Sequence, residues 1–303
     1  MIEARARAKI NLFLHAGEKR EDGFHPLQSL AVFADFGDRL GAEEADDLSL
    51  SLEGPFAAGL EGPDNLVLRA ARALAERTGR AAEAKLTLTK NLPVASGVGG
   101  GSADAAAALR LLAKLWQLKL DDKVLRDIGA TLGSDIPVCI RSQPSFMEGR
   151  GEILTPVPSL PRLPLLLVNP GVAIPTKDIF AALTEKRGVA MKLPSGGFSD
   201  LADLLRFLGS TANDLEAPAK AREPVIGEVL EALRRLPGAL VTRMSGSGAT
   251  CFALLPDEGG SDRAAALLKQ KYPGWWVQPA IVPDLGISRD TAGRDIGPTP
   301  DGL

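Results

Sequence analysis

The stretch of sequence from residue 93 to residue 112, PVASGVGGGSADAAAALRLL, constrains the fold more than any other part of the chain. It follows an alternation of apolar and polar residues over 85–90 that is typical of a half-buried strand, and Ser102 opens an alanine-rich run that predicts a helix. Four glycines, whose backbone loses much entropy on ordering, fall within five positions: Gly97, Gly99, Gly100 and Gly101. A bulky anion can approach the N–H groups of such a loop, and the start of a helix favours negative charge. The stretch therefore predicts a phosphate-binding loop, with a merely flexible turn as the alternative.

Two common phosphate-binding motifs do not describe this loop. A P-loop would place a lysine directly before Ser102, where this chain has Gly101. A dinucleotide fingerprint would need a glycine at the sixth position counted from Gly97, and that position is Ser102. The loop therefore calls for another class of phosphate site.

Length, charge and cysteine content limit the classes of protein that remain. With 303 residues, 45% of them hydrophobic and 24% charged, the chain is long enough for two globular domains. A formal net charge of −3 and scattered basic residues give no attraction for nucleic acid. No apolar run approaches the roughly 20 residues that span a bilayer, and Cys139 and Cys251 are too few for a disulfide framework. We therefore expect a cytoplasmic protein that binds neither nucleic acid nor a membrane; the sequence does not indicate its oligomeric state.

The order of the expected elements predicts a mixed α/β protein in two parts. Apolar alternation and short apolar runs predict strands over 7–15, 30–40, 47–52, 85–90, 163–169 and 271–282. Capping residues and helical periodicity predict helices over 64–79, from 102 onward, and over 121–131, 200–208 and 223–235. Asp22-Gly23 indicates a turn, and residues 136–140 are expected to form a strand or turn. The proline-rich stretch 155–164 indicates an N-terminal domain over 1–155 and a C-terminal domain over 156–286, followed by a flexible tail over 287–303.

Four side chains outside the glycine loop are candidates for chemistry. Lys9 and Asn11 alternate onto the same face of the first expected strand, close enough to serve one ligand, although a solvated lysine is the common alternative. His25 follows the turn at Gly23, and an inert loop histidine is its alternative. Asp135 precedes an apolar run, where a carboxylate either caps a turn or helix or acts as an acid–base group in a pocket of low dielectric constant.

Taken together, the motifs resemble the GHMP kinase superfamily over about residues 5–285. They are ARAKINLFL, DGFHPLQS, GPDNLVLRAA, LPVASGVGGGSADAA, LGSDIPV, EGRGEIL, PGVAIPT, NDLE and MSGSGATCFA. The resemblance implies a two-domain α/β (α+β) GHMP kinase fold with the active site in the cleft between the domains. DGFH, with AKINL before it and GSDIPV after it, is similar to the branch that uses ATP to phosphorylate the 2-hydroxyl of a cytidine diphosphate-linked methylerythritol. That reaction lies on the non-mevalonate (MEP) route to isoprenoid precursors.

The resemblance also implies a role for individual residues. Asp135 matches the catalytic aspartate that takes the proton of the attacking hydroxyl, and Lys9 matches the lysine that keeps this aspartate ionised. The positions implied to bind ATP are Asn65, Pro93, Gly97, Gly99, Gly100, Gly101 and Ser102, with Mg²⁺ as the accompanying ion and Ser102 as its candidate ligand. The positions implied to bind the substrate are Asn11, Phe24, His25, Thr176 and Phe180. In this scheme His25 bonds the cytosine edge and the two phenylalanines stack on either side of the base.

One residue departs from the superfamily pattern in the first turn of the helix after the glycine loop. Asp104 stands where the pattern has a neutral residue. Its charge suits the helix dipole, but it repels phosphate unless a magnesium ion lies between them. The departure leaves the role of Asp104 open between these two readings.

Two other functions compete with this interpretation. A different GHMP kinase, acting on mevalonate, homoserine or a sugar, would share the glycine loop but have no use for His25 and its aromatic neighbours. A non-catalytic nucleotide-binding protein would keep the loop but need neither Asp135 nor Lys9. The presence of all these groups in one chain favours the kinase of the cytidine-linked substrate.

Overall fold

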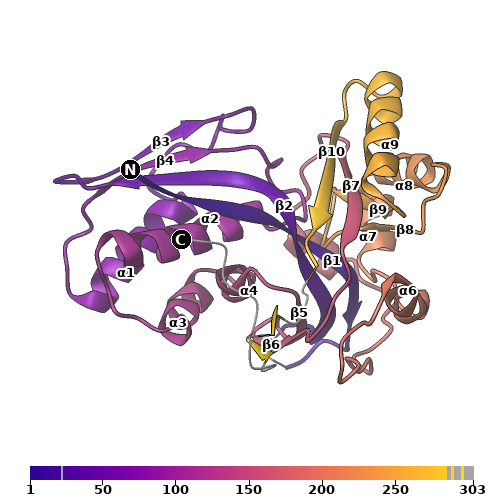
Figure 1. The fold of residues 1–303 in the computed structure, drawn as a ribbon, viewed down its shortest axis with the longest axis horizontal. Helices are drawn as coiled ribbons and strands as arrows, with labels where there is room; N and C mark the ends of the chain where they lie inside the picture. Colours follow the sequence, from indigo (N-terminus) through magenta and orange to yellow (C-terminus); the bar gives the residue numbers. More distant parts are fainter. Residues whose placement is uncertain (22, 285–287, 290–294, 297–303) are drawn as a thin grey trace.

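Two large β-sheets with helices packed against them form most of the protein (Figure 1). The computed structural model describes residues 1–21, 23–284, 288–289 and 295–296. Asp22 of the expected turn and most of the expected tail therefore lie outside the described residues. Two short strands within the tail, β11 (Ser288–Arg289) and β12 (Asp295–Ile296), pair with each other.

The first sheet is built on one long strand. Its members are β1 (Ile2–Ala16), β2 (Leu27–Glu43), β3 (Leu48–Glu53), β4 (Ala84–Thr89), β5 (Ser145–Gly149) and β6 (Ile153–Pro156). Along one edge, β2 pairs with β1; along the other, it pairs with β5 through its first residues and with β4 through its last. The pairing of β1 with β2 has two register shifts, one between Arg7 and Lys9 and one between Asn11 and Leu14. Shifts of this kind change the direction in which nearby side chains point. Lys9 and Asn11 thus lie in a short regular segment of β1 that has a register shift on either side.

Four helices cover one face of this sheet (Figure 1). They are α1 (Leu66–Thr78), α2 (Gly100–Leu115), α3 (Asp122–Leu132) and α4 (Ile136–Arg141). The side chain of Asn65 caps α1 by accepting a hydrogen bond from the Val67 N–H, and Gly79 ends the helix in a left-handed conformation. The alanine-rich α2 lies buried along the sheet because its small side chains allow close approach.

The second sheet is antiparallel and has the order β10-β7-β9-β8. Its strands are β7 (Leu163–Asn169), β8 (Val241–Met244), β9 (Cys251–Leu254) and β10 (Trp276–Val282). Four helices share an apolar core with it: α5 (Thr176–Ala181), α7 (Glu216–Arg222), α8 (Val225–Arg234) and α9 (Glu258–Lys271). The other face of this sheet packs against β1, β2 and α6 (Leu201–Gly209) in a central core. This core contains Phe13, Val32, Leu165 and Phe252. This central core joins the two sheets and sets the position of everything between them.

Most of the expected elements are present, and the differences have local causes. The segment after Asp135 is wrong as a strand or turn: it forms α4, because Pro137 occupies the first turn of a helix, where its missing N–H costs nothing. The helix after the glycine loop begins at Gly100, two residues before Ser102. The sequence interpretation also missed α7, α9, β5 and β6. The division between residues 155 and 156, which stays a prediction, falls at the end of β6.

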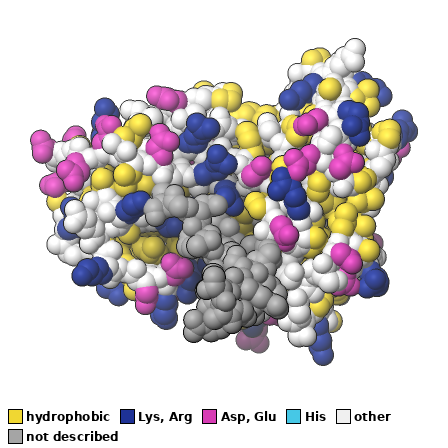
Figure 2. Space-filling view, viewed as in Figure 1, with side chains coloured by type: hydrophobic (Ala, Val, Ile, Leu, Met, Phe, Trp, Pro, Cys, Tyr) yellow, Lys and Arg dark blue, Asp and Glu magenta, His cyan; other side chains and the backbone are white. Residues whose placement is uncertain are grey.

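The surface agrees with the modest net charge. On the face that Figure 2 shows, basic and acidic side chains are interspersed rather than gathered by sign. Among the described residues, no helix is both long and apolar enough to cross a membrane.

Candidate active site

A buried lysine and a half-exposed aspartate form the centre of the candidate site. The Lys9 Nζ donates to Asp135 Oδ2 at 2.9 Å and to Asn11 Oδ1 at 3.2 Å. Lys9 is only 4% exposed, whereas the Asp135 side chain is 38% exposed. Asp135 stands at the N-cap position of α4, yet its side chain makes no capping hydrogen bond. Its carboxylate instead faces Lys9 on one side and open space on the other, which suits an acid–base group better than a cap.

Asn11 is fixed by the residues around it. Its Nδ2 donates to Ser29 Oγ at 2.7 Å, and its backbone N–H donates to Ser245 Oγ at 3.1 Å. Because the amide nitrogen is engaged, Oδ1 points to Lys9. Asn11 thus orients the lysine from within the same strand.

The glycine loop passes directly over Lys9, and two of its glycines are required for this path. Gly99 precedes α2 with φ +66°, and a Cβ there would lie 3.2 Å from Lys9 Cε. Gly97 has φ +78°, and its Cβ would lie 2.3 Å from the Ser245 carbonyl oxygen and 2.7 Å from the Gly248 nitrogen. Side chains at these positions would strain the backbone and push the loop off its neighbours. The glycines therefore allow contact with Lys9 on one side and with a second loop on the other.

That second loop, residues 245–248, lies in the connection between β8 and β9 of the second sheet. Ser245 Oγ donates to the Gly97 carbonyl at 3.0 Å, and the Thr250 N–H donates to the Ser96 carbonyl at 2.9 Å. The Thr176 hydroxyl at the start of α5 lies 2.8 Å from Ser247 Oγ. These hydrogen bonds bring loops from the two sheets together at the site, and they place Thr176 there as well.

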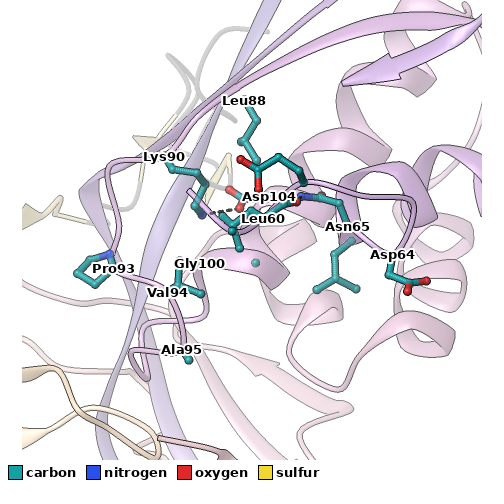
Figure 3. A pocket seen from close by; sticks show the side chains of 14 residues that line it. Leu60, Asp64, Asn65, Leu88, Lys90, Pro93, Val94, Ala95, Gly100 and Asp104 are labelled. Atoms are coloured by element: carbon teal, nitrogen blue, oxygen red, sulfur yellow. Dashed lines mark hydrogen bonds and ion pairs between the residues drawn. The ribbon is translucent and has the colours of Figure 1, made fainter. Parts of the chain in front are cut away.

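A cavity of about 400 Å³ opens on the other side of the glycine loop (Figure 3). Four of the residues expected to bind ATP line it: Asn65, Pro93, Gly100 and Gly101. Both polar atoms of the Asn65 side chain are engaged, Oδ1 by the Val67 N–H and Nδ2 by the Leu60 carbonyl. The Asn65 side chain therefore links the Leu60 segment to the start of α1, and so fixes this part of the cavity wall. Ser102, in the first turn of α2, is half-buried, and its hydroxyl makes no hydrogen bond within the described part of the chain.

The sequence interpretation missed a buried cluster of charges in the wall of this cavity. Lys90 donates to Asp104 Oδ2 at 2.6 Å and also pairs with the Asp38 carboxylate (Figure 3). Asp38 further accepts from the backbone N–H groups of Asn91 and Leu92 at 2.5 and 2.8 Å. Asp104 is thus neither exposed to phosphate nor free to serve an ion, because its carboxyl group is held by Lys90.

Burial governs the charge of this cluster. It raises the pKa of Asp104 to about 8; Lys90 opposes this shift, and the Asp38 carboxylate adds to it. Burial alone would lower the pKa of Lys90, but the two carboxylates raise it by more, so Lys90 stays charged. Within the described residues, Asp104 Oδ1 is buried without a hydrogen-bond partner. The cluster therefore holds two carboxyl groups against one ammonium group.

The remaining candidates lie around the loop before β2. His25 Nδ1 donates to the Gly17 carbonyl at 2.9 Å, which leaves Nε2 as the nitrogen that can meet a ligand. The His25 and Phe180 rings are stacked, with centroids 6.1 Å apart and planes inclined by 26°. Phe24 is 48% exposed. Its ring is in contact with the guanidinium of Arg150, with 3.7 Å between Cζ and the ring centroid.

Comparison with known proteins identifies the class. The model of the GHMP kinases N terminal domain matches residues 65–143, and that of the GHMP kinases C terminal domain matches residues 189–274. These regions contain the glycine loop, Asp135 and the 245–248 loop. The fold is that of a GHMP kinase, an enzyme class that uses ATP.

Individual relatives narrow the class further. A protein of Parvibaculum lavamentivorans named 4-diphosphocytidyl-2-C-methyl-D-erythritol kinase is 52% identical over 279 residues, which cover 90% of this chain and 95% of that protein. One of the same name from Cereibacter sphaeroides is 51% identical over 284 residues, or 92% of this chain and 99% of that one. The crystal structure of a 4-(cytidine 5'-diphospho)-2C-methyl-D-erythritol kinase superposes with a TM-score of 0.77 at 32% identity, covering 93% of this chain and all (100%) of that one. The chain belongs to the 4-diphosphocytidyl-2-C-methyl-D-erythritol kinase family.

Proposed function

We propose that this enzyme transfers the γ-phosphoryl group of ATP to the 2-hydroxyl of 4-diphosphocytidyl-2-C-methyl-D-erythritol, a step of the MEP route to isoprenoid precursors. The observation that carries the proposal is the Lys9–Asp135 pair, 2.9 Å apart, beneath the glycine loop. Phosphoryl transfer depends on in-line placement and on charge neutralisation more than on covalent chemistry. A nucleotide cavity and a paired carboxylate on opposite sides of one loop meet both needs.

ATP is assigned to the loop and the adjacent cavity. The base and ribose fit the 400 Å³ cavity beside Asn65 and Pro93, and the phosphates lie along Gly97, Gly99, Gly100, Gly101 and Ser102. The first N–H groups of α2 have no partner within the helix, so they attract the phosphates. The γ-phosphate is thereby directed toward Lys9, over which Gly99 passes.

Activation of the nucleophile, the substrate hydroxyl, is assigned to Asp135 as the general base. Its exposed oxygen accepts the proton of the substrate hydroxyl as that oxygen attacks the phosphorus. Lys9 keeps the carboxylate ionised and in place, and its positive charge offsets charge that develops between hydroxyl and phosphate. Asn11 holds Lys9 in this orientation.

Binding of the cytosine base, the end of the substrate far from the reacting hydroxyl, is assigned to the loop before β2. Nε2 of His25 can accept a hydrogen bond from the 4-amino group of cytosine because Nδ1–H is already donated to Gly17. Phe180, stacked with His25, and Phe24 provide faces for the base, and Thr176 lies where the second loop approaches the hydroxyl end. Binding the remote base holds the hydroxyl in line.

Magnesium is the expected companion of ATP here, and the residues present fit it. Mg²⁺ keeps several waters and binds mainly through substrate phosphates, so it needs no protein cage; none of the described residues form a cluster of three or more His, Cys, Asp or Glu side chains suited to a metal. The uncommitted hydroxyl of Ser102 is the protein oxygen that would hold it. When bound, the ion neutralises phosphate charge.

We place the enzyme in the cytoplasm. Cys139 and Cys251 are both buried free thiols. Burial raises the pKa of Cys139 to about 12, so this thiol stays protonated. Unpaired cysteines of this kind suit a reducing compartment.

A phosphotransfer assay tests the assignment. With ATP and Mg²⁺, we expect turnover of the cytidine-linked diol and not of mevalonate, homoserine or galactose. Asp135→Asn should lower turnover by roughly 10²–10⁴ while ATP binding is retained. Equal turnover in this variant would show that Asp135 is not the base. Equal turnover of the four alcohols would contradict the proposed substrate.

A further inference from the structure

Arg150 is a cation next to the candidate substrate site, and it forms no ion pair with another described residue. It lies in the turn between β5 and β6, and its guanidinium is in face contact with the Phe24 ring. Within the described ranges the guanidinium forms no ion pair, although Glu152 is two residues away. The Glu152 carboxylate instead accepts a hydrogen bond from the Arg150 backbone N–H, which fixes the turn. A charged side chain is thus held over an aromatic ring, and the described part of the chain offers its guanidinium donors no carboxylate partner.

The turn that carries Arg150 connects the two ends of the site. On one side, Phe24 directly precedes His25, the residue assigned to the base. On the other side, a Cβ at Gly151 would lie 3.6 Å from the carbonyl oxygen of Ser134, the residue before Asp135. Arg150 therefore stands between the group that meets the base and the group that meets the hydroxyl.

We propose that Arg150 binds the diphosphate of the substrate and so positions its hydroxyl for transfer. This inference rests on the proposed function, since the substrate there is a nucleoside diphosphate ester. Its diphosphate joins the base-bearing half to the erythritol half, so it must cross the interval that Arg150 occupies. The nearby Lys9 ammonium is already engaged by Asp135 and Asn11.

The chemistry of the guanidinium suits this role. A distance of 3.7 Å between Cζ and the ring centroid is that of two flat groups in contact through their faces. In that arrangement the N–H donors lie around the edge of the guanidinium, where a phosphate can accept two of them side by side. Phe24 thus serves as a platform that fixes the plane of the guanidinium before the substrate arrives.

Binding of cytidine and of cytidine diphosphate, measured by calorimetry on the full chain, separates this role from others. In the parent protein we expect cytidine diphosphate to bind more tightly than cytidine, with a preference that weakens as salt is added. Arg150→Gln should weaken cytidine diphosphate by about 10- to 100-fold and cytidine by less than about 2-fold. Arg150→Lys, which keeps the charge without the planar fork, should fall between the two. Arg206→Gln, an equal charge change on α6, is the matched control and should alter neither ligand.

Each outcome decides the question. Loss confined to the diphosphate ligand supports the inference, and in turnover assays kcat/KM should then fall far more than kcat. Equal loss of both ligands would mean that Arg150 acts only by supporting Phe24, and no loss of either would remove it from the site; both results overturn the inference while leaving the proposed function intact. If the parent protein binds neither ligand, the proposed function fails, and the inference fails with it.

Discussion

Replacing Lys90 by methionine should destabilise the protein strongly. Methionine keeps the length and apolar stem of lysine, so the change removes the charge with little change in packing. It leaves Asp38 and Asp104 buried with no cation between them. Asp38 would retain its two backbone N–H donors, but Asp104 would lose its hydrogen bond from the Lys90 ammonium.

The size of the effect follows from the burial of all three groups. The Lys90 side chain is 4% exposed and Asp104 5%, so water does not screen the loss. Breaking a buried ion pair by removing one partner costs about 3–5 kcal/mol. At roughly 2–4 °C per kcal/mol, the melting temperature should fall by about 10 °C.

The matched control is Lys85→Met, the same substitution within β4, the strand that Lys90 directly follows. Lys85 is 58% exposed, and its nearest carboxylate, Glu43, lies 3.9 Å away. Its loss should change the free energy of unfolding by no more than about 0.5 kcal/mol. Urea unfolding followed by circular dichroism measures both variants. If Lys90→Met costs no more than Lys85→Met, the buried cluster does not act as a unit and this reasoning fails.

Three further results are expected. The raised pKa of Asp104, about 8 against an ordinary 3.8, means that the folded state holds a proton that the unfolded state releases, so this group's stabilisation is present at low pH and is lost as pH rises to about 8. Relative to Asp104→Asn, the parent protein should therefore lose up to about 1.4 kcal/mol per pH unit between pH 6 and 8 in urea titrations; parallel curves would show that Asp104 does not titrate there. Gly99→Val should weaken ATP binding and lower turnover, because it strains a residue with φ +66° and crowds Lys9; calorimetry with wild-type affinity would place the phosphates elsewhere. His25→Ala should reduce the preference for the cytidine substrate over its uridine analogue, since uridine has O4 in place of the amino group; full discrimination in a competition assay would return His25 to a structural role.

The sequence predicts those parts of the site that follow from a local pattern along one strand. Alternation along β1 put Lys9 and Asn11 on one face, and the structure joins their side chains. Asp135 could not be separated from a capping residue by sequence alone, because that choice depends on where Lys9 lies, 126 residues away along the chain.

The charged cluster was missed for a related reason, although a signal exists. Asp38 is in phase with the buried Leu40, and Lys90 is in phase with the buried Leu86 and Leu88. Strand alternation therefore directs both charges inward, where each requires a partner of opposite sign. Asp104 breaks the apolar run of α2 in the same way. Pairing the three needs the sheet order, which no local pattern supplies.

The hydrogen bond between the Asn11 N–H and Ser245 Oγ has a consequence for the growing chain. It joins residues 234 positions apart, and the glycine loop likewise depends on Ser245 through the Gly97 carbonyl. The first strand to leave the ribosome therefore carries the lysine and asparagine of the site long before their last support is synthesised. Contacts so distant in sequence form late in folding. The supports of Asn11 and of the glycine loop are therefore complete only after residue 245 has been synthesised, so a chain truncated before that residue should not transfer phosphate.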